Sequence, residues 1–444
     1  MSSISIAAGE ADSKPQVLSD RVFNTGSVAV LGLGYVGLPT ALAFGEAGHR
    51  VIGIDVSEER LGRIKSRDVD LVPDDHARLR DALGSHERFV LTHDVSAMQE
   101  ADTVIVCVPT PVDAHMMPDL SLLRGACRQV VEAARPGQMI VLTSTTYVGT
   151  TRDLLVDPLK AAGLTVGQDV NVAFSPERIN PGVTSHSQSE VPRVVGGATP
   201  ECTGRAADFF GGVTKAVYPV ASPETAELTK LFENTFRAVN IAFVNEMANT
   251  CHELGVDVTQ VLDAAGTKPY GFMRFNPGPG VGGHCIPCDP HYLLWQLRAH
   301  RVSMPILETA MRAIAHRPVE VIERISDLLA SVRVVLESAR ILVVGVAYKP
   351  NVEDVRESPA IEIVSRLLSR GAEVTVTDPH VPSMRLNDGI SLVTRQLGDV
   401  DVSEFDLVLL HTRHSADDLS GLSGAKIVLD ATYSLSMLES AVML

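Results

Sequence analysis

The sequence predicts an α/β protein with two doubly wound parallel-sheet domains joined by a central helical region. A segment that begins near residue 25 reads as strand, glycine turn, helix and strand, and it ends at Asp55. A second segment with the same layout begins at Arg340 and ends at Asp378. Long helical patterns separate the two segments. Each segment is therefore one βαβ unit of its own domain, because such units build parallel sheets that helices cover on both faces.

Size and charge limit the classes of protein that this chain can represent. Its 444 residues are enough for two or three domains, and its formal net charge is −16. An acidic chain disfavours nucleic acid and anionic membranes as partners, since both need a basic surface. The apolar runs are too short to span a bilayer, and the N-terminus does not read as a secretory signal. The six cysteines are scattered, which favours a reducing cytoplasm over a disulfide framework.

Changes in pattern divide the chain into four predicted parts. We expect a flexible tail at 1–24, a dinucleotide-binding domain at 25–212, a central helical region at 213–335 and a third, α/β domain at 336–444. The tail is expected because the first residues of a domain are poorly ordered unless something holds them.

Short runs rich in β-branched residues predict further strands. They lie at 103–108, 138–143 and 171–174 in the first domain, and at 406–411 and 426–430 in the third. Because these runs alternate with helical stretches, we expect parallel pairing in both sheets.

One long helix dominates the predicted central region. Its pattern begins at Pro223 with Ser222 as the N-cap, and it ends before Gly255. More helix is predicted at about 257–265, and another long helical region at about 303–332. The central region is therefore expected to contain no sheet of its own.

A glycine pattern predicts a dinucleotide site in the first domain. Gly32, Gly34 and Gly37 follow a strand and open a helix, which allows a tight turn and a close approach of pyrophosphate. Asp55, at the end of the second strand, would bind the ribose hydroxyls and repel a 2′-phosphate, so NAD is favoured over NADP. Arg60 could lie near the adenosine or be a solvated surface charge. The alternative is a βαβ unit that binds FAD or no cofactor.

The third domain carries a degenerate copy of this glycine pattern. Gly345, Ala347, Tyr348 and Lys349 follow its first strand. Such a copy suits a different phosphate ligand, with Lys349 supplying charge. A purely structural second domain is the alternative.

The stretch GPGVGGHCIPCDPH points to thiol chemistry at Cys285. Its glycines let the backbone approach a ligand, and a helix predicted to begin at Asp289 would favour the thiolate. A redox pair with Cys288 is an alternative, as is a zinc site with His284 or His291. A structural zinc site needs a second such pair, which the sequence lacks. Cys288 itself is best read as a small buried residue.

Three other groups of polar residues stand where ligands bind in such folds. Lys230 and Asn234 lie one turn apart on the long helix and share a face. The motifs STTYVGT at 144–150 and SPER at 175–178 each follow a strand. The carboxyl ends of parallel strands are the usual place for ligands.

Together these motifs resemble a known family, the nucleotide-sugar 6-dehydrogenases that act on UDP-glucose, UDP-N-acetylhexosamines and GDP-mannose. The resemblance covers residues 26–435, with GLGYVGLP, CVPTP, STTYVGTT, SPER, ETAELTKLFENTFRAVNIAF, GPGVGGHCIPCDP and GVAYKPNVEDVRESPA in the family's order. It implies two Rossmann-like domains around helices that build a homodimer. It also implies NAD on the first domain and the nucleotide sugar between the middle and third parts. The glycine-rich loop is most similar to the UDP-N-acetylglucosamine branch, with UDP- or dTDP-glucose as the rival substrate.

The resemblance also assigns roles to residues that match the family's motifs. Catalytic roles fall on Cys285, Lys230, Asp289, Asn234, Thr145 and Glu177. Cofactor contacts fall on Gly32, Gly34, Tyr35, Val36, Gly37, Asp55, Arg60, Thr110, Thr145 and Arg356. Substrate contacts fall on Glu177, Lys230, Asn234, Arg274, Gly282, Gly283 and Lys349, and no metal ligand is expected. Val148, Arg274, Asn276 and Cys288 depart from the family's usual residues, which leaves the sugar preference open.

The implied chemistry is a four-electron oxidation of a sugar CH2OH group to a carboxylate. An aldehyde forms first, the Cys285 thiolate adds to it, and a second hydride loss gives a thioester that water hydrolyses. Two other readings remain. One is a two-electron β-hydroxyacid dehydrogenase, which needs no cysteine. The other is a non-catalytic sensor of NAD or nucleotide sugars.

Overall fold

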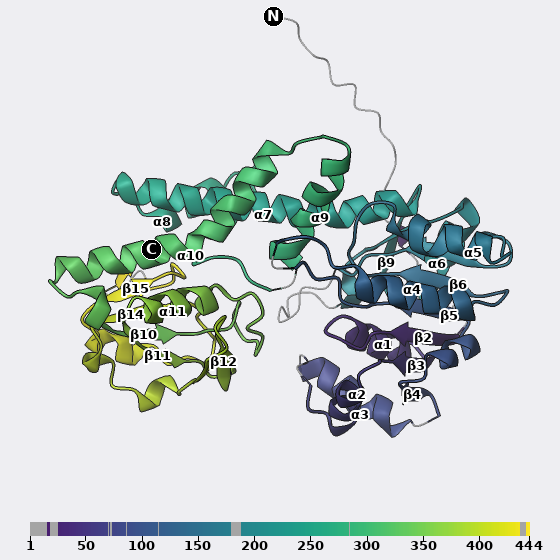
Figure 1. Ribbon diagram of the computed structural model, residues 1–444, viewed down its shortest axis with the longest axis horizontal. Helices are drawn as coiled ribbons and strands as arrows, with labels where there is room; N and C mark the ends of the chain where they lie inside the picture. The colour runs from purple at the N-terminus through teal and green to yellow at the C-terminus, as the bar shows by residue number, and fades with distance from the viewer. Residues whose placement is uncertain are drawn as a thin grey trace, which may run out of the picture. The chain divides into compact units, whose positions relative to one another are not determined.

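The computed structural model describes residues 16–17, 25–69, 71, 73–85, 87–113, 115–178, 188–283, 285–435 and 441–444. The chain divides into two compact units (Figure 1). The first comprises Met1–Thr110 and Asp119–Lys230, and the second comprises Pro111–Pro118 and Leu231–Leu444. Each unit is described by itself below.

The first unit is built on a nine-stranded sheet in the order β1-β9-β8-β7-β6-β5-β2-β3-β4. Its strands are β1 Gln16–Val17, β2 Ser27–Leu31, β3 Arg50–Ile54, β4 Phe89–Thr92, β5 Thr103–Val106, β6 Met139–Leu142, β7 Asn171–Phe174, β8 Arg193–Gly197 and β9 Ala216–Val220. All pairs from β4 across to β7 are parallel. Strands β3 and β4 lie on one side of β2, and strands β5, β6 and β7 lie on its other side. The direction of winding therefore reverses between β2 and β5, which makes this the Rossmann switch point.

Helices cover the faces of this sheet. They are α1 Gly37–Glu46, α2 Glu58–Ser66, α3 Pro73–Gly84, α4 Ser121–Ala133, α5 Asp157–Ala161 and α6 Pro200–Gly211, with a π-helical turn, η2, at Arg152–Val156. The strands in the middle of the sheet are buried on both faces. That burial explains why they read as continuous apolar runs rather than as alternating ones.

The sheet extends beyond the domain boundary that the sequence predicts at residue 212. Strand β9 lies past that boundary yet pairs in parallel with β8, and β8 pairs antiparallel with β7. Neither β8 nor β9 was predicted from the sequence. In the segment predicted as a tail, Gln16–Val17 pairs antiparallel with β9. Residues 1–15 and 18–24 lie outside the described residues.

The helical region predicted in the middle of the chain is confirmed. Its helices are α7 Pro223–Glu253, α8 Val258–Gly266, α9 Cys285–Ala299 and α10 Pro305–Ser331. The Ser222 hydroxyl accepts a hydrogen bond from the Thr225 backbone N–H at 3.3 Å, as an N-cap does. Gly255 ends the helix in a left-handed conformation with φ at +66°.

The second unit contains a five-stranded, all-parallel sheet in the order β11-β10-β14-β15-β16. Its strands are β10 Arg340–Val344, β11 Glu373–Thr377, β14 Leu407–Leu410, β15 Val428–Asp430 and β16 Ala441–Met443. Helix α11 Pro359–Ser369 packs on β11, and α10 packs on α11. A separate hairpin joins β12 Ser383–Arg385 to β13 Ser391–Val393. The second Rossmann-like domain is therefore confirmed, with its own switch between β10 and β14.

The two faces of this five-stranded sheet are covered differently. On one face, buried residues of α10 and α11 form a continuous apolar core with Ile341, Val343 and Leu409. On the other face, Leu342 and Leu410 pack under short 3-10 turns that carry Phe405 and Leu422. The thinner cover on the second face leaves room for the cavity described below. Among the described residues, no helix is long and apolar enough to cross a membrane.

Candidate active site

The turn after β2 is shaped for a dinucleotide. Gly32 has φ at +88° and its N–H donates to the Ile54 carbonyl at 2.8 Å. A Cβ on Gly37 would lie 1.8 Å from the Gly32 carbonyl oxygen, so helix α1 can begin here only with glycine. A Cβ on Gly34 would meet nothing within 4 Å. The space beside Gly34 is therefore open to a ligand, as close approach of a pyrophosphate requires.

The acidic residue after β3 holds this turn in place. The Asp55 carboxylate accepts a hydrogen bond from the Leu33 N–H at 2.8 Å and another from the Ser57 N–H at 2.9 Å. Arg60 donates from Nε to the Leu33 carbonyl at 2.9 Å. Arg60 is thus attached to the glycine turn rather than being only a solvated charge.

These features fit NAD. The turn residues Tyr35 and Val36 lead into α1, whose N-terminus supplies backbone N–H groups for phosphate. The partly buried Asp55 retains oxygen lone pairs that can accept from ribose hydroxyls.

Three loops at the carboxyl ends of β5, β6 and β7 bring the predicted polar residues to one edge of the first sheet. The buried Thr110 donates from its hydroxyl to the Thr145 carbonyl at 2.7 Å, so the CVPTP and STTYVGT motifs are joined directly. Ser144 likewise donates to the Val108 carbonyl at 2.8 Å. The structure therefore brings Thr110 and Thr145 together beside the switch point.

Glu177 has a buried cationic partner that sequence reasoning missed. The Arg193 guanidinium on β8 donates to the Glu177 carboxylate at 2.6 Å, and both side chains are less than a tenth exposed. Arg193 also donates to the Ser175 hydroxyl at 3.1 Å and lies over the Phe210 ring. The pairing holds the Glu177 carboxylate in one orientation at the end of β7. No sequence signal pointed to Arg193, because strand β8 itself was not recognised.

Lys230 is buried on α7, and one turn earlier lies a carboxylate that the sequence analysis did not single out. Glu227 is 1% exposed and accepts from the Gly149 N–H at 2.6 Å, the Thr151 N–H at 2.8 Å and the Thr151 hydroxyl at 2.7 Å. Burial raises the pKa of Glu227, although these hydrogen bonds oppose the rise. Glu227 thus fastens the STTYVGT loop to the helix that carries Lys230.

Cys285 is exposed and is the first residue of α9. The helix therefore begins four residues before the predicted start at Asp289, which places the sulfur at the positive end of the helix dipole. That location favours a thiolate. Cys288 lies on the same helix but is 5% exposed, and burial raises its pKa to about 12.

The sequence leaves a redox pair and a zinc site open for Cys285 and Cys288. None of the six cysteines, all of which lie within the described residues, forms a disulfide. Across the described part of the chain, no group of three or more His, Cys, Asp or Glu side chains could hold a metal ion. His284, one of the candidate zinc ligands, lies outside the described residues.

Asn234 and Asp289 are joined directly. The Asn234 amide on α7 donates to the Asp289 carboxylate on α9 at 2.5 Å. Asp289 is 1% exposed, so its charge is held in a site that water does not reach freely. The structure therefore brings together three residues of the second unit that the resemblance assigns to catalysis, with Cys285 and Asp289 one turn apart on α9.

The glycines before Cys285 are required by close contacts within the second unit. A Cβ on Gly282 would lie 2.6 Å from the Tyr348 Cβ, and one on Gly283 would lie 2.7 Å from the Tyr348 ring. The Gly283 N–H also donates to the Arg356 carbonyl at 3.0 Å. The loop leading to Cys285 is thus packed on the turn after β10, which carries Lys349.

The start of the same loop is held by a buried arginine that sequence reasoning missed. Arg317 on α10 is 1% exposed and donates to the Gly278 carbonyl at 2.9 Å and to Asn249 at 2.7 Å. Asn245 accepts from the Gly278 N–H at 2.9 Å. Arg317 stands inside a helical pattern, where nothing in the sequence distinguishes a buried arginine from a solvated one.

Three cations predicted to contact ligands have partners within the protein. Arg274 pairs with Asp263 and donates to Asn276 at 3.1 Å. Arg356 forms a two-point pair with Asp354, at 2.9 and 2.6 Å. Lys349 lies over the ring of its neighbour Tyr348, 5.3 Å from the centroid. Arg274 and Arg356 are more than a third exposed, so a ligand could still recruit them.

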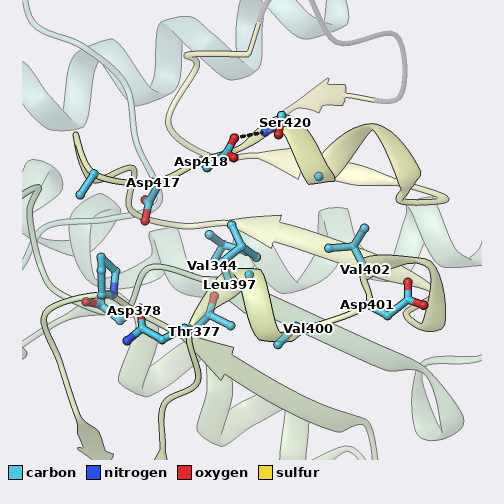
Figure 2. A pocket seen from close by; sticks show the side chains of 15 residues that line it. Val344, Thr377, Asp378, Leu397, Val400, Asp401, Val402, Asp417, Asp418 and Ser420 are labelled. Carbon is cyan, nitrogen blue, oxygen red and sulfur yellow. Dashed lines mark hydrogen bonds between the residues drawn. The ribbon is translucent and has the colours of Figure 1, made fainter.

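A cavity of about 480 Å³ opens at the carboxyl end of the second sheet (Figure 2). Asp378, Asp401, Asp417 and Asp418 line it, and its described lining includes no Lys, Arg or His. Asp401 and Asp418 each accept a backbone N–H from the residue two positions on, at 3.0 Å. The acidic wall repels phosphate, so this cavity is not suited to a diphosphate.

Comparison with known proteins agrees with this geometry. Three models of the UDP-glucose/GDP-mannose dehydrogenase family match the chain in order: the NAD binding domain at 26–214, the central domain at 224–314 and the UDP binding domain at 342–434. The UDP-N-acetyl-D-glucosamine 6-dehydrogenase of Pseudomonas aeruginosa is 35% identical over 356 residues, which cover 80% of this chain and 83% of that protein.

The chain belongs to the UDP-glucose/GDP-mannose dehydrogenase family. The UDP-N-acetyl-D-mannosamine dehydrogenase of Escherichia coli K12 is 34% identical, with 80% of this chain and 86% of that protein covered. Among solved structures, the UDP-D-ManNAc dehydrogenase of Pyrococcus horikoshii has a TM-score of 0.84 and 30% identity, covering 94% of this chain and 98% of that one. The UDP-glucose dehydrogenase of Pyrobaculum islandicum has a TM-score of 0.82 and 27% identity, covering 95% and 98%.

Membership in this family confirms several expectations from the sequence. The protein is an NAD-dependent oxidoreductase, its first domain binds NAD, and its third domain is the family's UDP binding domain. The match at 26–214 spans β2 to β8 of the first sheet, and the match at 342–434 spans most of β10 to β15 of the second. Family membership does not favour the other two hypotheses, a two-electron β-hydroxyacid dehydrogenase and a non-catalytic sensor.

Proposed function

We propose that this protein oxidises the C6 hydroxymethyl group of a UDP-activated N-acetylhexosamine to a carboxylate, using NAD. The observation that carries the proposal is the exposed Cys285 thiol at the N-terminus of α9, one turn before the buried Asp289. A two-electron alcohol dehydrogenase needs no thiol nucleophile, whereas capture of an aldehyde does. Relatives that act on UDP-N-acetylhexosamines support the substrate class.

The first oxidation removes a hydride and a proton from the C6 alcohol and leaves an aldehyde. NAD supplies the hydride acceptor for this and for the second oxidation. Lys230 is the cation on α7 suited to stabilise the developing oxyanion, because its burial strengthens the interaction. Asp289, held by Asn234, is the group suited to handle the proton.

The second oxidation proceeds through a covalent bond to Cys285. Its thiolate adds to the aldehyde carbon and forms a thiohemiacetal, which loses a second hydride to give a thioester. Water then attacks the thioester, the C–S bond breaks, and the carboxylate and the free thiol are released. Thr145 and Glu177 are the groups we assign to positioning that water, with Glu177 held in place by Arg193.

A substrate panel tests the activity. We expect NADH release with UDP-N-acetylglucosamine or another UDP-N-acetylhexosamine to exceed that with UDP-glucose, dTDP-glucose and GDP-mannose. The yield should be two NADH for each sugar consumed. A yield of one would favour a two-electron dehydrogenase, and binding without turnover would favour a sensor. Either result would overturn the proposal, while a preference for UDP- or dTDP-glucose would correct only the sugar.

A matched pair of cysteine variants tests the mechanism. Cys285→Ala should abolish formation of the uronate, because the aldehyde has no thiol to capture it. Cys288→Ala, a change of the same kind on the same helix, should retain two NADH per sugar, because Cys288 is a buried apolar contact. Full four-electron turnover by Cys285→Ala would show that the thiol is not the nucleophile.

We also propose that the protein is a homodimer and that α7 forms its interface. Leu228, Phe232, Phe236 and Phe243 are 42–66% exposed and recur along one side of this helix. A continuous apolar stripe on a chain with a net charge of −16 marks an interaction surface rather than a solvated face. A second copy offers the same stripe, so a two-fold axis would bury both at once.

A further inference from the structure

The third domain uses its strand-end aspartate differently from the first domain. Asp378 follows β11 as Asp55 follows β3, and each of these strands pairs in parallel with the strand before its turn. Asp378 is only 2% exposed. One of its oxygens accepts from the Val346 N–H at 2.8 Å and the Ala347 N–H at 3.1 Å. The bond to Val346 matches the one that Asp55 makes with the Leu33 N–H, but Asp378 is buried whereas Asp55 is partly exposed. Its burial closes the Asp378 carboxylate to a ribose.

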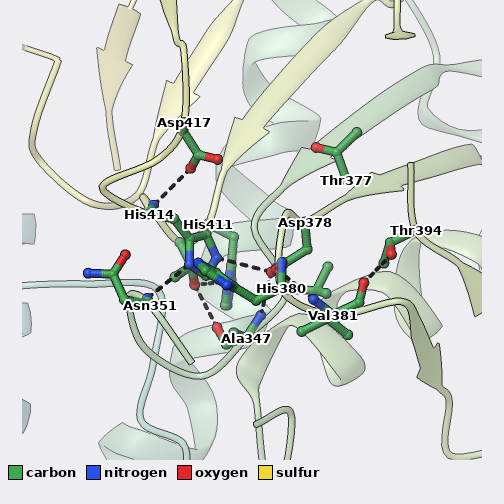
Figure 3. Close-up of polar contacts among 12 residues, drawn as sticks. Ala347, Asn351, Thr377, Asp378, His380, Val381, Thr394, His411, His414 and Asp417 are labelled. Atoms are coloured by element: carbon green, nitrogen blue, oxygen red, sulfur yellow. Dashed lines mark hydrogen bonds and ion pairs between the residues drawn. The ribbon is translucent and has the colours of Figure 1, made fainter. Parts of the chain in front are cut away.

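Asp378 has a histidine partner that makes a second contact with the same turn. His414 is 1% exposed, and its Nε2 lies 3.1 Å from the Asp378 carboxylate (Figure 3). Its Nδ1 accepts from the Asn351 backbone N–H at 2.9 Å. Because a backbone N–H can only donate, the ring proton lies on Nε2 and is donated to Asp378.

The charge of Asp378 is well stabilised by these contacts. Burial alone would raise the pKa of Asp378, but hydrogen bonds from His414 and from the Val346 and His380 N–H groups outweigh burial and lower the pKa to about 2. The His380 ring packs on the His414 ring with centroids 4.8 Å apart. The pair is thus an ionised carboxylate and a neutral imidazole of fixed tautomer.

The turn held by this pair carries Lys349. Besides the bonds to Asp378 and His414, the Ala347 carbonyl accepts from the Thr412 hydroxyl at 2.7 Å. The Val346 carbonyl accepts from the Ser358 hydroxyl at 2.7 Å. The backbone on both sides of Lys349 is therefore fixed by buried side chains.

The same turn packs on the loop that leads to Cys285. The Tyr348 side chain occupies the space that side chains on Gly282 and Gly283 would fill. Any shift of the turn would move Tyr348 against these two glycines. A continuous path of contacts thus runs from Asp378 and His414, through the turn, to the substrate loop.

We propose that His414, anchored by Asp378, is a positioning residue that sets the Lys349 turn and the Cys285 loop for nucleotide-sugar binding. This inference rests on the proposed function. His414 touches neither substrate nor cofactor in this scheme, and it acts through Asn351 and Tyr348. NAD binding by the first domain should not depend on it.

Two substitutions of His414 separate its two contacts. His414→Gln places an amide N–H where Nε2 stands and keeps the bond to Asp378, but it offers no acceptor to Asn351. His414→Asn places an amide oxygen near Nδ1 and keeps the bond to Asn351, but it is too short to reach Asp378. We expect His414→Gln to raise the KM for the nucleotide sugar about tenfold, as loss of a buried hydrogen bond does. The KM for NAD should stay within about twofold.

His414→Asn should keep both KM values near those of the wild type and lower only the thermal midpoint. A merely structural role predicts that both variants lower the midpoint and leave the sugar KM unchanged, which would overturn the proposal. Equal rises in the KM for sugar and for NAD would overturn it too. Failure of the proposed function is distinct, since the wild-type protein would then turn over no nucleotide sugar.

If His414→Gln does not fold, Tyr348→Leu provides the decisive variant. It removes the ring contact with Gly283, keeps the Cβ that lies beside Gly282 and leaves the buried network intact. The proposal requires the same selective rise in the KM for the nucleotide sugar. An unchanged sugar KM in Tyr348→Leu would show that the turn does not act through the loop.

Discussion

The Asn234 amide on α7 donates a hydrogen bond to the buried carboxylate of Asp289 on α9, across 2.5 Å. This bond joins the helix that carries Lys230 to the helix that begins with Cys285. The orientation of Asp289 is therefore set from outside its own helix, by a residue one turn beyond Lys230.

Loss of the Asn234 amide should reduce catalysis more than binding. In Asn234→Ala we expect kcat to fall at least about tenfold, because the Asp289 carboxylate loses a donor inside the protein. Steady-state NADH release checks this expectation. Asn240→Ala on the same helix is the control, since the Asn240 amide bonds only to the preceding turn at Phe236. Equal kcat values in the two variants would contradict the role given to Asn234.

The cofactor preference should depend on Asp55. Replacement by Ser removes the charge that repels a 2′-phosphate, so the ratio of kcat/KM for NADP to that for NAD should rise. The absolute values should fall for both cofactors, because the Leu33 and Ser57 N–H groups lose their carboxylate acceptor. An unchanged ratio would mean that Asp55 does not face the ribose.

Acid should destabilise the second unit through His411. Burial lowers the pKa of His411 from 6.5 to about 4. As the pH falls through this window the unfolded chain takes up the proton first, so stability present above pH 6.5 is lost toward pH 4. The loss is at most roughly 1.4 kcal/mol per pH unit. The depressed pKa of Asp378 adds a further loss only below its ordinary 3.8.

Urea unfolding at pH 7 and pH 5 measures this effect, followed by the fluorescence of Trp295, the one tryptophan of the chain. The midpoint should be lower at pH 5. His411→Leu should narrow the difference between the two midpoints, whereas His300→Leu, a change at an exposed histidine of the same unit, should not. A difference that His411→Leu leaves intact would rule out His411 as its source.

The proposed dimer should depend on the apolar side of α7. Phe232→Glu places a charge on the most exposed phenylalanine of the stripe, 66% exposed, and we expect the molar mass by light scattering to halve. His252→Glu adds the same charge at an exposed position on the opposite side of α7 and should leave the mass unchanged. A wild-type mass equal to that of one chain would remove the basis of the proposal.

Much of the fold is readable from the sequence because local patterns and tertiary structure agree there. The glycine turn at Gly32, the Ser222 cap of α7 and the parallel strands all follow from chemistry within a few residues. Strands β8 and β9 were missed because β8 runs antiparallel to β7 and follows no crossover helix pattern.

The site residues that were predicted likewise have distinctive local motifs, and those that were missed do not. Cys285, Asp289 and Asn234 were predicted because their motifs are distinctive. Arg193 and Arg317 were missed because their roles depend on partners far away in the chain: Arg193 pairs with Glu177, and Arg317 holds Gly278. A single sequence carries no mark that separates a buried arginine from a surface one.

The burial of Asp378 has a consequence for the order of events in catalysis. In the described part of the chain, only the turn after β2 keeps the open glycine and the accessible carboxylate that a dinucleotide needs. The proposed four-electron oxidation must therefore use the same dinucleotide-binding site twice. NADH from the first oxidation has to dissociate before a second NAD binds. In this scheme the C6 aldehyde must stay bound while the cofactor is exchanged. Its retention therefore decides whether the enzyme releases a uronate or a free aldehyde.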